Sequence, residues 1–104
     1  MATVDLDNSN FKETIDNNDF VILDFWAPWC GPCRMLGPVL DQVAAEMGDD
    51  VVIGKINIDE EQDLAVKFGV RSIPAMFILK DGEVRESFVG VKDKATLVNS
   101  LKSV

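Results

Sequence analysis

The chain has 104 residues, 47% of them hydrophobic, and it carries a formal net charge of −8 with no histidine. This length predicts one domain, residues 1–104, with enough apolar side chains for a buried core. The acidic balance argues against nucleic acid and anionic membrane surfaces as partners, because binding to phosphate needs clustered lysine and arginine. No apolar stretch is long enough to cross a bilayer, since Asp24, Lys55 and Lys80 interrupt the longest candidates.

The N-terminal residues, Met1 to Asp5, contain neither a basic start nor an apolar signal core. This favours a cytoplasmic location, although a processed form whose signal had been removed would begin in a similar way. We therefore expect a soluble, cytoplasmic protein, with a monomer as its expected state.

Strand-like and helix-like segments alternate along the first two thirds of the chain. The near-continuous apolar run at residues 21–27 predicts a central strand that helices cover on both faces. A second run at residues 51–58, rich in β-branched side chains, predicts another buried strand. Apolar residues recur at helical spacing before, between and after these two strands, and a weaker strand signal lies near the N-terminus. These further segments are a strand near residues 3–6 and helices with apolar positions at Phe11 and Ile15, from Met35 to Met47 with an end near Gly48, and from Leu64 to Phe68 with an end at Gly69.

The last third of the chain departs from this alternation. Two apolar segments, residues 76–79 and 84–89, flank Asp81-Gly82, a pair suited to the positive φ angles of a two-residue hairpin turn. They predict two antiparallel strands, and Asp93 is a suitable N-cap for a final helix with one apolar face. The predicted fold is α/β, in the order β-α-β-α-β-α-β-β-α, with a central mixed five-stranded sheet flanked by four helices.

Two cysteines, Cys30 and Cys33, follow the central strand at its carboxyl end, where reactive groups gather in sheets of this kind. Cys30 lies where the strand gives way to a helix, so unpaired backbone N–H groups and the positive end of the helix dipole would favour its thiolate. Pro32 fits the first helical turn because its missing N–H has no intrahelical partner there. The spacing brings both sulfurs close enough to form a reversible disulfide. We expect Cys30 to be exposed and Cys33, one turn deeper, to be shielded and to react second.

A Cys-x-x-Cys pair is also compatible with half of a metal site or with an incidental pair. A structural zinc site takes four nitrogen or sulfur ligands, and this chain offers no third cysteine and no histidine. Zinc would therefore require carboxylates or a second chain. We therefore expect no metal, with the Cys30–Cys33 pair itself as a redox-active disulfide.

The segment from Phe25 to Cys33, which reads Phe-Trp-Ala-Pro-Trp-Cys-Gly-Pro-Cys, resembles the active-site segment of thioredoxins. The resemblance extends over essentially the whole chain. It implies the thioredoxin fold and a protein dithiol/disulfide oxidoreductase, with Cys30 as the nucleophile and Cys33 as the resolving cysteine.

Other residues match the family outside that segment. Asp24 resembles its buried aspartate, and Lys55 resembles the lysine partner on the neighbouring strand. Ile73-Pro74 resembles the cis-proline loop beside the disulfide, and Gly90 resembles the glycine of the substrate-facing surface. Pro38 resembles the proline that bends the active-site helix, where it removes a backbone hydrogen bond.

An aspartate inside an apolar strand loses hydration, which favours its protonated form and makes it a conceivable proton carrier near neutral pH. Our hypothesis is that Asp24 assists the deprotonation of Cys33 through water and that Lys55 modulates Asp24. Two plainer alternatives remain open: a carboxylate simply paired with Lys55, and a Lys55 side chain that extends to solvent. For Trp26 and the four methionines we expect plain packing.

A cis bond before Pro74 would present the Ile73 backbone to an extended substrate, which would pair as an added strand. We expect a flat, mostly apolar docking surface around the disulfide. This surface consists of Trp29, Gly31, Pro32, Ile58, Ile73, Pro74, Val89, Gly90 and Val91. Near it, Pro28 stands where thioredoxins often carry a polar residue, and Ser72 and Ala75 stand where Gly and Thr are common. These departures bear on substrate preference and leave the sulfur chemistry unchanged.

The expected reaction is the reduction of disulfides in target proteins, in which Cys30 attacks and Cys33 resolves the mixed disulfide. The resemblance implies recycling by a thioredoxin reductase that draws on NADPH, with no cofactor bound to this chain. One alternative is a disulfide oxidase or isomerase, although Gly31-Pro32 between the cysteines resembles the reducing members. The other is a non-enzymatic binding module with the same fold.

Overall fold

A computed structural model describes residues 3–104 of the chain. Strands and helices follow one another in the order that the sequence predicts, with an additional 3-10 turn, η1, after α2. No helix within residues 3–104 is both long enough and apolar enough to cross a membrane. The elements are β1 (Thr3–Asp5), α1 (Phe11–Asp16), β2 (Phe20–Trp26), α2 (Gly31–Met47), η1 (Gly48–Asp50), β3 (Val52–Asn57), α3 (Gln62–Lys67), β4 (Ala75–Lys80), β5 (Glu83–Val89) and α4 (Lys94–Ser103).

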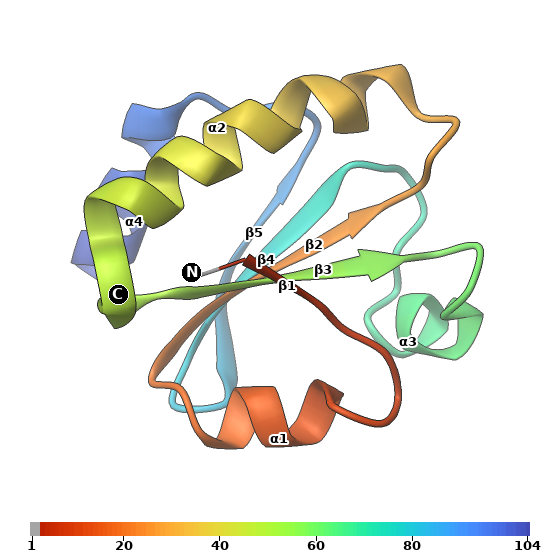
Figure 1. The fold of residues 1–104 in the computed structure, drawn as a ribbon, viewed down its shortest axis with the longest axis horizontal. Helices are drawn as coiled ribbons and strands as arrows, with labels where there is room; N and C mark the ends of the chain where they lie inside the picture. Colours follow the sequence, from red (N-terminus) through yellow and green to blue (C-terminus); the bar gives the residue numbers. More distant parts are fainter. Residues whose placement is uncertain (1–2) are drawn as a thin grey trace.

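The five strands form one mixed sheet in the order β1-β3-β2-β4-β5 (Figure 1). β1 and β2 flank β3 and run parallel to it, whereas β4 is antiparallel to both β2 and β5. Helices α2 and α4 pack on one face of the sheet, and α1 and α3 pack on the other. The predicted α/β fold, with a mixed five-stranded sheet between helices, is confirmed.

The middle strand, β2, contributes side chains to the core on both faces of the sheet. Val21, Leu23 and Phe25 pack with α1 and α3, whereas Ile22 packs with α2 and α4. All four side chains are withdrawn from solvent, which explains why this strand reads as a continuous apolar run. Asp24 interrupts the run, and the alternation of the strand places it on the α2 face.

Turn and cap residues define the ends of several elements. Asp81 and Gly82 have φ angles of 53° and 82° and form the predicted hairpin turn between β4 and β5. Asp93 caps α4, because its side chain accepts a 2.8 Å hydrogen bond from the backbone N–H of Thr96. Gly48, with a φ angle of 60°, ends α2 as predicted, but the η1 turn that begins there is not predicted.

Three loops that are distant in sequence meet at the carboxyl end of β2. β2 ends at Trp26, and α2 begins shortly afterwards at Gly31. The backbone N–H of Ile58, just after β3, donates a 2.9 Å hydrogen bond to the carbonyl of Trp26. Ile73, from the loop before β4, packs against the same group of residues. This edge of the sheet therefore holds the predicted site.

Candidate active site

Cys30 and Cys33 form a disulfide at the first turn of α2, with their Cα atoms 5.3 Å apart. Cys30 is the N-cap of this helix and has extended backbone angles, φ −89° and ψ 109°. The backbone N–H of Cys33 donates a 3.2 Å hydrogen bond to Cys30 Sγ. The sulfur thus occupies the place that a capping side-chain oxygen usually takes, facing the positive end of the helix dipole.

The two sulfurs are shielded to the same degree. Cys30 is 5% exposed and Cys33 is 6% exposed. The prediction that Cys30 alone would be exposed is therefore wrong for the disulfide-bonded form. The cause is packing from other segments, because Trp26, Ile58 and Ile73 all pack against the pair, and the carbonyl oxygen of Ile73 lies 3.9 Å from Cys30 Sγ.

The loop beside the disulfide contains a cis peptide bond between Ile73 and Pro74. Pro74 is buried, and its carbonyl accepts a 2.8 Å hydrogen bond from the backbone N–H of Gly90. Gly90 has a φ angle of 90°, a conformation that favours glycine. These contacts bring Cys30, Ile73, Pro74 and Gly90 together at one edge of the sheet.

Asp24 is 2% exposed and lies in the core beneath α2. Burial raises the pKa of its carboxyl to about 7, and the charge of Lys55, which lowers the pKa, offsets only part of this effect. Lys55 is half-buried on β3, and its Cα pairs with that of Asp24. Among the ion pairs formed within residues 3–104, none joins these two side chains. Their charges therefore interact through space rather than in direct contact.

Lys55 places its ammonium over the ring of Trp26, with Nζ 5.3 Å from the ring centroid. For Trp26 the sequence predicts plain packing only, and this contact is an additional one. A signal was available, because strand alternation puts Asp24 and Trp26 on one face and strand pairing puts Lys55 beside them. Trp26 also packs against the buried group of Ala27, Cys30 and Cys33, so it lies between the lysine and the disulfide region.

Trp29 is 66% exposed and directly precedes the first cysteine. Its indole N–H donates a 3.1 Å hydrogen bond to Oδ2 of Asp59, in the loop after β3. Asp59 is a second site residue that is not predicted from the sequence. The signal that could have found Asp59 is its position just after a parallel strand, next to Ile58, which the sequence places on the docking surface.

The other predicted surface residues come from α2 and from the end of β5. Gly31 and Pro32 form the first turn of α2. Val89 is 61% exposed and pairs with Ala75, directly after the cis-proline. Val91 is also exposed and adjoins the group through the chain beyond Gly90. The structure gathers most of the predicted surface at one edge, from residues 29–32, 58, 73–74 and 89–90.

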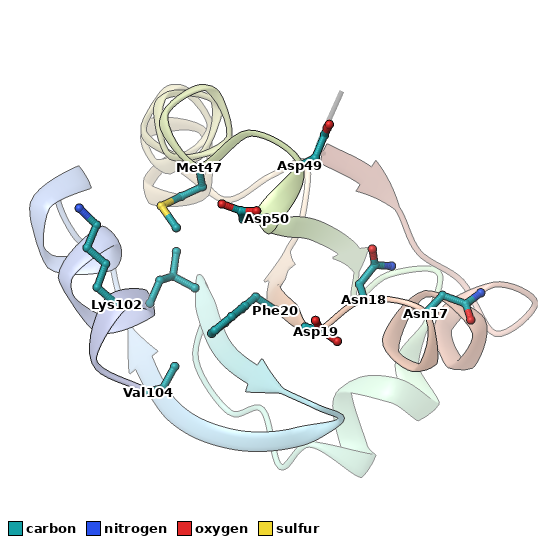
Figure 2. A pocket seen from close by; sticks show the side chains of 10 residues that line it. Asn17, Asn18, Asp19, Phe20, Met47, Asp49, Asp50, Lys102 and Val104 are labelled. Atoms are coloured by element: carbon teal, nitrogen blue, oxygen red, sulfur yellow. The ribbon is translucent and has the colours of Figure 1, made fainter.

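A pocket of about 480 Å³ lies at the other end of the sheet (Figure 2). Its lining includes Asp19, which precedes β2, and Asp50, which precedes β3, together with Lys102 near the end of α4. Because the cysteines follow β2, the pocket is separated from them by the length of that strand. Within residues 3–104, no group of three or more His, Cys, Asp or Glu side chains is arranged to hold a metal ion.

These features define a class of protein. A disulfide at the N-terminus of a helix, after the central strand of a helix-covered mixed sheet, is the site of a dithiol/disulfide oxidoreductase. Such a pair of sulfurs takes up and releases two electrons by thiol–disulfide exchange.

Comparison with known proteins identifies the family. The model of the thioredoxin family matches residues 2–103. A thioredoxin from Bacillus subtilis is 50% identical over 97 residues, which cover 93% of this chain and 92% of that protein. A thioredoxin from Haemophilus influenzae is 44% identical over 95 residues, covering 90% and 89%. The structure of a mutant thioredoxin from Halobacterium salinarum NRC-1 matches with a TM-score of 0.89 at 36% identity, covering 97% of this chain and 88% of that one. The chain belongs to the thioredoxin family.

Proposed function

We propose that this chain acts as a single domain, residues 1–104, that reduces disulfide bonds in target proteins. The observation that carries the proposal is the 3.2 Å hydrogen bond from the Cys33 backbone N–H to Cys30 Sγ at the start of α2. Once the disulfide is reduced, this donor and the helix dipole stabilise a thiolate at Cys30. The thiolate is the form that attacks a disulfide.

Reduction proceeds in two exchanges. In the first, the Cys30 thiolate attacks one sulfur of the target disulfide, whose S–S bond breaks as a mixed disulfide forms and the other target sulfur leaves as a thiolate. In the second, the Cys33 thiolate attacks Cys30 Sγ and releases the remaining target sulfur. Two electrons pass from the dithiol to the target, and Cys30 and Cys33 end as a disulfide.

Asp24 is the proposed acceptor of the Cys33 proton, through an intervening water. A carboxyl with a pKa of about 7 is partly ionised at neutral pH, so it can both accept and return a proton. Lys55 modulates this group because its charge favours the carboxylate. Their shared face beneath α2, the helix that Cys30 caps and that contains Cys33, supports the assignment.

The target is proposed to bind on the docking surface around the disulfide. Trp29 and Val89 provide exposed apolar surface there. Ile73, whose carbonyl lies next to Cys30 Sγ, is placed to pair with an extended segment of the target. Ser72 and Ala75 flank this segment and bear on which targets are preferred.

The disulfide formed in each turnover has to be reduced again by an external donor. Membership of the thioredoxin family supports a thioredoxin reductase, drawing on NADPH, as that donor. We assign the protein to the cytoplasm, as a monomer, and we assign it no bound cofactor because the dithiol itself carries the electrons.

Reduction of insulin by dithiothreitol tests the proposed activity. Wild-type protein should accelerate the reaction, and Cys30→Ser should abolish the acceleration because it removes the nucleophile. Ser103→Ala, an exposed position at the end of α4, serves as a control that should keep full activity. Equal rates with wild type and Cys30→Ser would contradict the enzyme and support a binding module.

A redox titration in glutathione buffers separates a reductase from an oxidase or isomerase. We expect the Cys30–Cys33 disulfide to have a reduction potential no higher than that of the cytosolic glutathione pool. A potential well above that pool would contradict the reductase and support the oxidase.

A further inference from the structure

Lys55 has two partners of different chemistry on one face of the sheet. Its Cα pairs with that of Asp24, and its Nζ lies 5.3 Å from the centroid of the Trp26 ring. Asp24 Oδ1 and Trp26 Nε1 are both buried, and neither has a hydrogen-bond partner from residues 3–104. Within the described chain, the Trp26 indole N–H therefore donates no hydrogen bond to Asp24, and Lys55 is a residue that interacts with both side chains.

A half-buried lysine has two places for its ammonium. The flexible stem of Lys55 can carry the charge out to water, or the charge can stay over an aromatic face that attracts it. In this structure it lies over Trp26. Because the charge of Lys55 lowers the pKa of Asp24 and burial raises it, the location of the ammonium decides how much of the burial effect is offset.

We propose that Trp26 is a positioning residue, whose ring holds the Lys55 ammonium within electrostatic reach of the Asp24 carboxyl. The catalytic consequence of this positioning rests on the proposed function, in which Asp24 accepts the proton of Cys33. Trp26 also packs against the buried group formed by Ala27, Cys30 and Cys33, so one side chain adjoins the disulfide region and contacts the lysine that acts on Asp24.

Few charged or titratable groups face this carboxyl. Within residues 3–104, Lys55 is the charged side chain that acts on it. Met76 pairs with Asp24 from β4, and the helix over this face, α2, has the titratable Cys30 as its N-cap and Cys33 in its first turn. The cysteines do not titrate while they are disulfide-bonded. The oxidised protein therefore isolates the interaction of Trp26, Lys55 and Asp24.

The test is a double-mutant cycle in which the measured quantity is the pKa of the Asp24 carboxyl. The titration of the Asp24 carboxyl carbon is followed by NMR in the oxidised protein, for Trp26→Leu, Lys55→Met and the double variant. Lys55→Met keeps an unbranched stem and removes the charge. With Lys55 present, Trp26→Leu should raise the pKa of Asp24 by about 0.5. In the Lys55→Met background, the same substitution should leave the pKa unchanged.

Two results would overturn the proposal. An equal shift in both backgrounds would show that Trp26 acts only through burial, and a zero or downward shift with Lys55 present would show that the ring does not hold the charge near Asp24. If Trp26→Leu does not fold, Trp26→Phe keeps a ring with weaker attraction and should give a smaller upward shift. No upward shift in Trp26→Phe would then overturn the proposal.

The same variants separate this inference from the proposed role of Asp24. In the reduced protein, the rate at which Cys33 resolves a mixed disulfide is measured against pH. If the pKa of Asp24 moves as predicted and the rate profile does not, Trp26 positions Lys55 but Asp24 is not the proton acceptor. If both move together, both proposals are supported.

Discussion

Asp24 on β2 and Lys55 on β3 are paired across the sheet, and the lysine charge offsets only part of the effect of burial on the carboxyl. The resulting pKa is about 7, against an ordinary value of 3.8. Between these values, the unfolded chain has released this proton while the folded chain retains it. The contribution of the protonated carboxyl to stability is therefore complete below pH 3.8 and is lost as the pH rises through 7.

Asp24→Asn removes this titration. At pH 8 we predict that the variant is more stable than wild type, by on the order of 4 kcal/mol, because no buried carboxylate has to form. Near pH 4 the gain should disappear. Denaturant unfolding of the oxidised proteins at both pH values measures the difference, with Asp41→Asn, an exposed position on α2, as the control. A difference that is the same at both pH values would contradict the assignment.

Cys33→Ser should stop the reaction after the first exchange. The Cys30 thiolate can still attack a target, but the group that releases the target is gone, so a mixed disulfide should accumulate. Mass spectrometry after incubation with a disulfide-containing peptide should detect a 1:1 adduct at Cys30. Cys30→Ser is the matched control and should give no adduct by this route. Normal turnover by Cys33→Ser would show that Cys33 is not the resolving cysteine.

Val89→Asp tests the docking surface. Val89 is 61% exposed beside the cis-proline loop, and a charge there should weaken binding of an apolar target segment. We predict about a tenfold lower kcat/KM for insulin, mainly through KM. Val84→Asp makes the same change at the other end of β5, where the side chain is 51% exposed, and should leave kcat/KM unchanged. Equal losses in the two variants would indicate a general effect on β5.

The sequence predicts most of the fold because its signals are local. The buried strand β2 appears as an apolar run, the hairpin turn is set by Asp81-Gly82, and α4 begins at the capping residue Asp93. Each of these depends on side chains that are adjacent in the chain. The 3-10 turn at residues 48–50 lacks such a signal and is not predicted.

The parts of the site that sequence reasoning misses depend on contacts between distant segments. The shielding of Cys30 comes from Ile58 and Ile73, which only the folded sheet brings together. The bond from Trp29 to Asp59 joins two loops in the same way. Positions of residues along a strand can be inferred, but which side chain covers which requires the packed structure.

The acidity of Cys30 is the property on which the proposed chemistry depends most directly. Its reaction with iodoacetamide is measured against pH in the Cys33→Ser protein, with an unstructured peptide of residues 26–36 that carries the same substitution as the matched control. We predict a midpoint at least about one pH unit below that of the peptide cysteine, which should titrate near the ordinary value of about 8.5. A midpoint equal to or above that of the peptide would contradict a thiolate stabilised by the start of α2.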